Sequence, residues 1–203
     1  MHHLVCLLQK LFFEKMNQDV LPSYKIFNVK IHFKLGYELI FSPEMMKTIT
    51  KHSNFVVLRL SHYVYIIFPK NGHINVSGIK TFHDINSALS VFNSHFHTTV
   101  QASNIKIDNT TAHGRFNVDK VQLTKLASCN PHEHFNISIR PYYFPSALLR
   151  PKVLQSSTSS QTVTTCLLFS NGKFNIIGGK SIKTIEHTLY QLCVLMKTLS
   201  LTT

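Results

Sequence analysis

The sequence has few acidic residues. Nine Asp and Glu stand against 21 Lys and Arg among 203 residues, so the formal net charge is +12 when the 13 His are counted as neutral. No two acids have a spacing that suggests general acid–base catalysis, and no Gly-rich phosphate loop of the Walker type is present. We therefore expect no enzyme, no cofactor and no small-molecule substrate.

Long apolar runs are also missing. A membrane helix needs about 20 consecutive apolar residues. The stretch from Leu4 to Phe13 is shorter, and Gln9 and Lys10 interrupt it. The same stretch has no charged start and no small-residue cleavage site, so it does not have the pattern of a signal peptide. We expect neither a membrane partner nor secretion.

Cysteine is sparse and scattered. The residues Cys6, Cys129, Cys166 and Cys193 show no disulfide-framework spacing, which is typical of a reducing compartment. Cys129, His132 and His134 could be metal ligands, but zinc sites usually have a second ligand pair at comparable spacing, and the sequence has none. We expect no metal.

An internal repeat is the most informative feature that is present. Segments 66–80 and 167–180 share an apolar-apolar-Phe run, followed by Asn-Gly, Asn, Gly and Lys in the same order. The likeness continues beyond them: Ile85, Leu89 and Phe92 correspond to Ile185, Leu189 and Leu192. A repeated half-domain implies a pseudo-two-fold molecule. Such a molecule suits a partner with its own approximate two-fold symmetry, as duplex DNA has.

The basic charge follows the repeat. No acid lies between Glu44 and Asp84 or between Glu133 and Glu186, and both windows contain several Lys and Arg. A positive field of this kind attracts polyanions. A solvated basic surface is the alternative, but it gives no reason for acid-free windows at matching places in two repeats.

Apolar periodicity and turn residues predict the secondary structure. Expected strands cover 28–33, 55–60, 63–68 and 74–77, then 104–107, 144–149, 162–169 and 174–177. Expected helices begin at Ser42, where Ser, Pro and Glu form a good first turn, and cover 83–92, 117–126 and 182–196. The expected domains are a helical lead-in (1–25), a first repeat (26–100) and a second repeat (101–203) with a Ser/Thr-rich hairpin insert (155–165).

Each repeat thus reads as strand, helix, three strands, helix. If both helices lie on one face of the strands, the other face is left bare. Two copies side by side predict an α+β fold, in which one long curved antiparallel sheet carries its helices on the convex face. The concave face then needs a ligand.

Three segments carry a family resemblance. They are Leu167 to Lys180, Phe144-Pro145 with Pro141 and Arg150 around it, and Lys34-Leu35-Gly36. Over roughly residues 26 to 197 the chain resembles the TATA-box-binding protein (TBP) family. The resemblance implies a two-repeat saddle that engages the minor groove, bends promoter DNA and helps assemble a transcription initiation complex. The implied partners are double-stranded DNA, IIB-like or IIA-like general transcription factors, and RNA polymerase.

The resemblance also implies which residues contact DNA. The family inserts two Phe pairs between base pairs, and those positions match Phe55, Phe68, Phe144 and Phe169. The central Asn of each family repeat matches Asn28 and Asn104. Further minor-groove contacts would come from Lys30, Lys106, Asn75, Asn175 and Pro145. Phosphate contacts would come from Arg59, Lys70, Lys80, Arg150, Lys173 and Lys180. The alternative for any single Phe is a place in the core.

The chain departs from the family at several positions. Lys30 and Lys106 stand two positions after the expected central Asn residues, where the family has small apolar residues, so the expected floor is more cationic. Arg140 and Tyr142 replace acids in the region where factor IIB docks. The alternative function is therefore a TBP-fold protein-interaction module with weak or no TATA specificity. Such divergence suits a viral relative, which would act in the nucleus or in a cytoplasmic viral factory.

Overall fold

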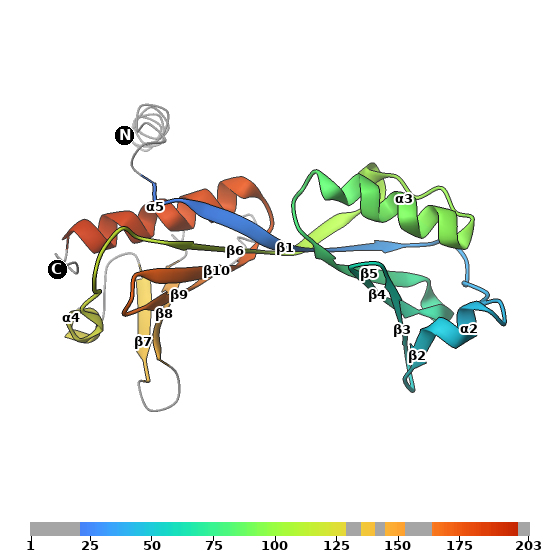
Figure 1. Cartoon of the computed structure of the whole chain (residues 1–203), viewed down its shortest axis with the longest axis horizontal. Coiled ribbons are helices and arrows are strands. Elements are labelled where there is room, and N and C mark those ends of the chain that lie inside the picture. Colours follow the sequence, from blue (N-terminus) through green and yellow to red (C-terminus); the bar gives the residue numbers. More distant parts are fainter. Residues whose placement is uncertain (1–20, 129–134, 141–144, 153–163, 199–203) are drawn as a thin grey trace.

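The chain forms one antiparallel sheet. The computed structural model of the protein describes residues 21–128, 135–140, 145–152 and 164–198. Ten strands pair in the order β2-β3-β4-β5-β1-β6-β10-β9-β8-β7, and every pair is antiparallel. Figure 1 shows an arch, with β1 and β6 at its middle and the other strands descending toward either end. The expected α+β fold with a single curved sheet is confirmed.

The two halves of the arch have the same order of elements. The first half contains β1 (Tyr24–Lys34), α2 (Met45–Thr48), β2 (Ile49–Lys51), β3 (Val56–Leu60), β4 (Tyr63–Phe68), the 3₁₀ turn η2 (Pro69–Asn71), β5 (His73–Ile79) and α3 (Asp84–Phe96). The second contains the 3₁₀ turn η3 (Ala102–Asn104), β6 (Lys106–Arg115), α4 (Leu123–Ser128), β7 (Phe135–Ile139), β8 (Ser146–Pro151), β9 (Thr165–Phe169), β10 (Lys173–Gly179) and α5 (Ile182–Thr198). Each half therefore has one strand more than the sequence predicted, because the outer strands β2 and β7 were missed.

Helices α3 and α5 cover the convex face, as predicted (Figure 1). In the first half, buried Ile85, Leu89 and Phe92 of α3 join one core cluster with buried strand residues such as Ile31 and Tyr65. In the second half, Ile185, Leu189 and Leu192 of α5 join the second core cluster with strand residues. These are the repeated apolar positions of the sequence, so the repeat encodes one helix docked on each half-sheet.

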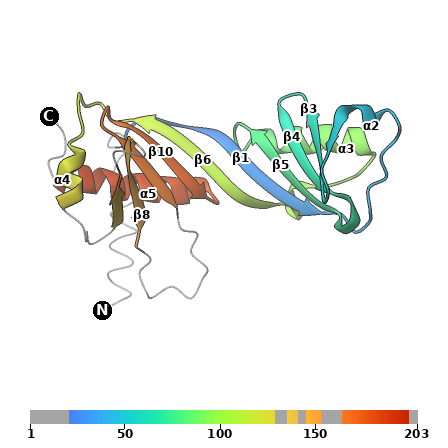
Figure 2. The ribbon, with the colours of Figure 1, turned by 90° about the horizontal axis from the view of Figure 1, so that it is seen from below.

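Alternation along the strands leaves the opposite face uncovered by these helices. In β4, Tyr63, Tyr65 and Ile67 are buried while the residues between them are partly exposed. In β1 the buried residues are Val29, Ile31 and Phe33. Figure 2, seen from below, shows β1 and β6 in front with α3 and α5 behind. We call the side of the sheet that faces away from α3 and α5 the open face.

The turn before the last strand is repeated with its hydrogen bonds. The side-chain Oδ1 of Asn71 accepts from the backbone N–H of His73 at 3.1 Å, and Asn171 does the same for Lys173 at 3.1 Å. The following glycines adopt left-handed conformations, with φ of 65° at Gly72 and 77° at Gly172. A side chain is strained at such angles, so this explains why Asn-Gly recurs in both repeats.

Some predictions fall outside the described residues. The amphipathic lead-in helix, the candidate metal ligands Cys129, His132 and His134, and most of the 155–165 insert are among them. Within the described ranges, no group of three His, Cys, Asp or Glu side chains could hold a metal ion. In the same ranges no helix is both long enough and apolar enough to span a bilayer.

Candidate nucleic-acid interface

An aromatic pair marks one end of the open face. Phe68 ends β4 and Phe55 precedes β3, and both side chains are partly exposed. Their ring centroids lie 5.6 Å apart at an interplanar angle of 48°. His52 stacks on the other side of Phe55, at 4.5 Å. The structure therefore brings two of the four predicted wedge residues together, on the face that the helices leave uncovered.

The second repeat places Phe169 where the first places Phe68. Phe169 ends β9, is partly exposed, and alternates with buried Cys166 and Leu168. Its ladder partner is Ser146 in β8. Because Val56 pairs with Ile67 in the first repeat, Ser146 is the counterpart of Phe55. The predicted equivalence of Phe55 and Phe144 is therefore off by two residues in the strand register. Phe144 itself lies outside the described residues.

The middle of the open face carries a pair of Asn residues. The Oδ1 of Asn28 accepts from the backbone N–H of Gly78 at 3.0 Å, and the Oδ1 of Asn109 accepts from Gly178 at 2.7 Å. Gly78 and Gly178 occupy the same place in the two repeats, with φ of 89° and 95°. Since each amide oxygen is engaged by the glycine N–H, the amide NH₂ group remains as a donor.

The predicted match of Asn28 with Asn104 is wrong. Asn104 belongs to the 3₁₀ turn η3, which precedes β6, and it is exposed outside the sheet. Asn109 is the residue that shares the Gly contact of Asn28. The counterpart of Lys30 is therefore Thr111, which is only 7% exposed, and not Lys106. Asn-x-Lys occurs at both 28–30 and 104–106, and this local pattern misled the prediction.

Asn75 and Asn175 are correctly matched in position. Each is the third residue of the last strand of its half, and each lies between two buried neighbours. Both are partly exposed, on the side opposite the core. Whether they contact a groove floor stays a prediction.

Cationic side chains surround this surface. Arg59, Lys70, Lys80, Arg150, Lys173 and Lys180 are all exposed, as are Lys106 and Pro145. Lys106, at the start of β6, and Lys180, just after β10, line one shallow groove together with Ile85 and Asn86 of α3, so these two cations lie beside a convex-face helix. Burial lowers the pKa of His95 and of His187, which belong to the convex-face helices α3 and α5.

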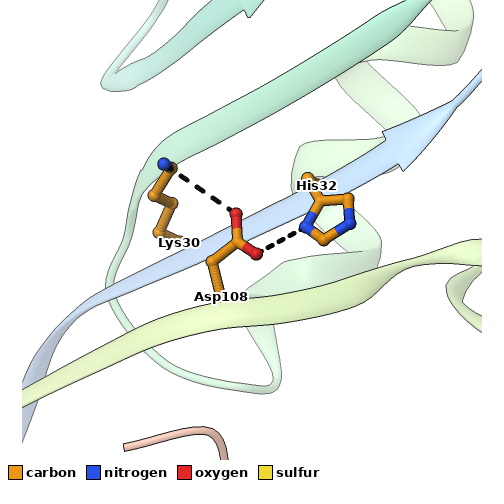
Figure 3. A network of polar contacts seen from close by, with 3 residues as sticks. All are labelled: Lys30, His32 and Asp108. Atoms are coloured by element: carbon orange, nitrogen blue, oxygen red, sulfur yellow. Dashed lines mark hydrogen bonds and ion pairs between the residues drawn. The ribbon is translucent and has the colours of Figure 1, made fainter. Parts of the chain in front are cut away.

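One acid interrupts the positive surface. Asp108 accepts a hydrogen bond from His32, with Nδ1 to Oδ1 at 2.5 Å, and its other oxygen lies 3.8 Å from the Nζ of Lys30 (Figure 3). Lys30 and His32 alternate with buried Val29 and Ile31, so this cluster lies on the open face. The charge of Lys30 is thus partly offset, which the sequence did not predict because the two segments are far apart in the chain.

Aromatic stacking occupies the corresponding place in the other half. Phe27, 38% exposed, stacks on His113 with ring centroids 5.0 Å apart and 28° between the planes. The surrounding groove is lined by cationic side chains, Lys25, Arg115 and Lys173 among them. The open face is therefore cationic and aromatic under the second repeat, whereas it contains a carboxylate under the first.

This two-repeat saddle, with paired turns, paired Asn–Gly contacts and the long helices α3 and α5 on the convex face, has the TBP fold. The solved structure of Methanococcus jannaschii TBP is similar, with a TM-score of 0.65 and 22% sequence identity over 87% of this chain and 99% of that chain. Residues 104–199 match the family model "Transcription factor TFIID (or TATA-binding protein, TBP)". No curated protein sequence matches the chain.

Residues 104–199 thus match the TATA-binding protein family model, and the first half of the chain repeats the same order of strands and helices. The family is one of non-enzymatic transcription factors that bind DNA. At this coarse level, the resemblance seen in the sequence and the expected fold class are confirmed.

Proposed function

We propose that this protein is a TBP-like transcription factor that binds the DNA minor groove, bends promoter DNA and helps assemble an initiation complex. The observation that carries the proposal is the repeated placement of Phe68 and Phe169 at the ends of β4 and β9, partly exposed on the open face. Exposure of an apolar ring to water is unfavourable at that position. The same ring can be buried between two base pairs of a duplex that unstacks there.

The physical mechanism follows from the geometry. A Phe ring entering a base step costs a few kcal/mol of unstacking, and the bent duplex regains this by covering more protein surface. The NH₂ groups of Asn28 and Asn109 can donate to the O2 and N3 acceptors that A·T pairs present in the minor groove. Exposed Lys and Arg around the face would neutralise phosphates and make binding fall steeply with salt.

The partners and location follow the same proposal. We propose that double-stranded DNA, IIB-like or IIA-like factors and RNA polymerase bind this protein, in the nucleus or in a cytoplasmic viral factory. A IIB-like partner would have to present an acidic surface to Arg140, which is exposed just after β7.

Binding and bending can be measured together on a duplex labelled at both ends. We expect energy transfer between the ends to rise on binding, and affinity to fall linearly in a log–log plot against salt. The variant in which Phe55, Phe68, Phe144 and Phe169 are all replaced by Ala should keep part of the electrostatic binding but lose the bend. Tyr37→Ala is the control, because Tyr37 is 55% exposed in the loop after β1. A bend that survives the fourfold change, or an absence of binding at low salt, would contradict the proposal.

A second candidate is a protein-interaction module with weak or no TATA specificity. It is favoured by exposed apolar side chains outside the strands: Ile40 is 89% exposed and Tyr37 is 55% exposed, in the segment between β1 and α2. A folded protein that fails to bind any duplex at low salt would support this candidate over the first.

A further inference from the structure

The strands of this sheet contain a single acid. Among the ten strands that the structure describes, Asp108 is the one Asp or Glu, and it lies on the open face beside Lys30 and His32. A carboxylate on a surface that attracts phosphate weakens that attraction. The Asp108 carboxylate therefore suggests a role that neither a neutral nor a cationic side chain could fill.

A β-bulge turns Asp108 toward the open face. The ladder between β1 and β6 passes from Lys30 with Asn109 to Ile31 with Ile107, so Asp108 has no partner across the strands. A bulge of this kind re-aims a side chain. Asp108 consequently shares the open face with Asn109, the residue that follows it and donates toward the groove in the proposed function.

Phe27 is the pseudo-symmetric counterpart of Asp108. The same ladder skips Phe27 between Ile26 and Asn28, so each bulged residue directly precedes a central Asn. Each also contacts the His that lies four residues beyond the other central Asn: Phe27 stacks on His113, and Asp108 accepts from His32. One position beside the pseudo-two-fold axis therefore carries a ring in one half and a carboxylate in the other.

We propose that Asp108 determines sequence specificity by accepting a hydrogen bond from a guanine amino group in the minor groove, which gives the saddle one preferred orientation on DNA. This rests on the proposed minor-groove function. Every A·T pair offers only acceptors in that groove, whereas a G·C pair adds the N2 amino donor. An ionised carboxylate only accepts, and it has about four lone-pair sites, of which His32 occupies one.

The counterpart Phe27 cannot make this distinction, because its side chain has no hydrogen-bonding group. A·T pairs facing Asp108 meet acceptor against acceptor, which is unfavourable, while a G·C pair is favoured there. A binding site with one G·C pair beside its centre is therefore bound with the Asp108 half over that pair. In the reversed orientation Phe27 lies over that G·C pair and makes no hydrogen bond with it.

The test adds a minor-groove amino group to one base pair at a time. In an A·T duplex, 2,6-diaminopurine replaces adenine at successive positions, which leaves the major-groove edge of the pair unchanged. We expect wild-type binding to tighten about tenfold at one distance from the centre, as one hydrogen bond to a charged group would give. A second diaminopurine at the mirror position should add no more than the statistical factor of about two, because only one half carries the carboxylate.

Asp108→Asn should lose this preference, since the neutral amide can also donate to acceptors. Asp119→Asn is the matched control, because Asp119 is an exposed acid in the loop after β6 and its loss changes the net charge equally. A comparison of G·C with inosine·C in wild-type protein needs no variant, and inosine should bind about tenfold more weakly. Equal affinity for all duplexes, or a preference retained by Asp108→Asn, overturns the inference. Absence of binding to every duplex overturns the proposed function itself.

Discussion

Replacing Phe68 with Ala should separate DNA bending from folding. Phe68 lies on the open face, where its main described aromatic contact is Phe55 at 5.6 Å. Loss of an aromatic pair costs about 0.5–1.5 kcal/mol, so we expect the free energy of unfolding to fall by about 1 kcal/mol in Phe68→Ala. The variant should stay folded at room temperature, because domains of this size are usually stable by about 5–15 kcal/mol.

Phe33→Ala is the matched comparison. Phe33 lies in the same half but faces the core, is 2% exposed, and meets Phe92 edge to face at 5.1 Å. Core Phe→Ala substitutions cost about 3–5 kcal/mol. Phe33→Ala should therefore destabilise the protein several times more than Phe68→Ala does, yet bend DNA normally under conditions in which it remains folded.

Urea unfolding gives the two stabilities, and energy transfer across an end-labelled duplex gives the bend. The reasoning is refuted if Phe68→Ala is as destabilising as Phe33→Ala, because Phe68 would then be a core residue. It is equally refuted if Phe68→Ala is mildly destabilised and bends DNA like wild type.

Three further changes test other parts of the structure. Asn109→Ala should lower stability by about 1 kcal/mol by leaving a backbone N–H without its acceptor, and should weaken DNA binding, while Asn104→Ala should alter neither in the same urea and binding assays. Gly78→Ala should destabilise the protein by more than about 1 kcal/mol, since the φ of Gly78 is 89° and a Cβ there would lie 2.4 Å from a backbone oxygen. Gly36 has open space around it, so Gly36→Ala should be near neutral in the same thermal melts. Burial and a nearby carboxylate raise the pKa of Tyr24 to about 12 from 10.0. The contribution of the protonated Tyr24 to stability is therefore complete below pH 10 and is lost as the pH rises toward 12. Tyr24→Phe should flatten the pH dependence of stability between these values.

Much of the fold could be predicted because the repeat places its signals locally. The strand 63–68 was predicted with its observed bounds, and α5 begins at Ile182 as expected. Strand alternation, the Asn-Gly turns and the apolar helix positions are all short-range patterns. The outer strand β2 was missed because three residues, Ile49 to Lys51, are too few to show a period. Strand β7 was missed although Phe135, Ile137 and Ile139 alternate with polar residues, which is a usable strand signal.

The site was harder to predict because its contacts join distant segments. Asn28 contacts Gly78 and Asn109 contacts Gly178, but the second pair is further apart in the sequence than the first. Spacing alone therefore could not match the two Asn residues. A usable signal was present: Asn28 and Asn109 are each followed four residues later by a His. The contact between Asp108 and His32 has no local signal, since it depends on a bulge and on the pairing of β1 with β6.

The most direct test of the wedge mechanism places 2-aminopurine at each position of a bound duplex, since its fluorescence rises when the base is unstacked. If the two aromatic ends enter the DNA, fluorescence rises at two steps on opposite sides of the centre, and Phe68→Ala and Phe169→Ala each remove one of the two signals. Tight binding with no rise at any position would contradict the mechanism.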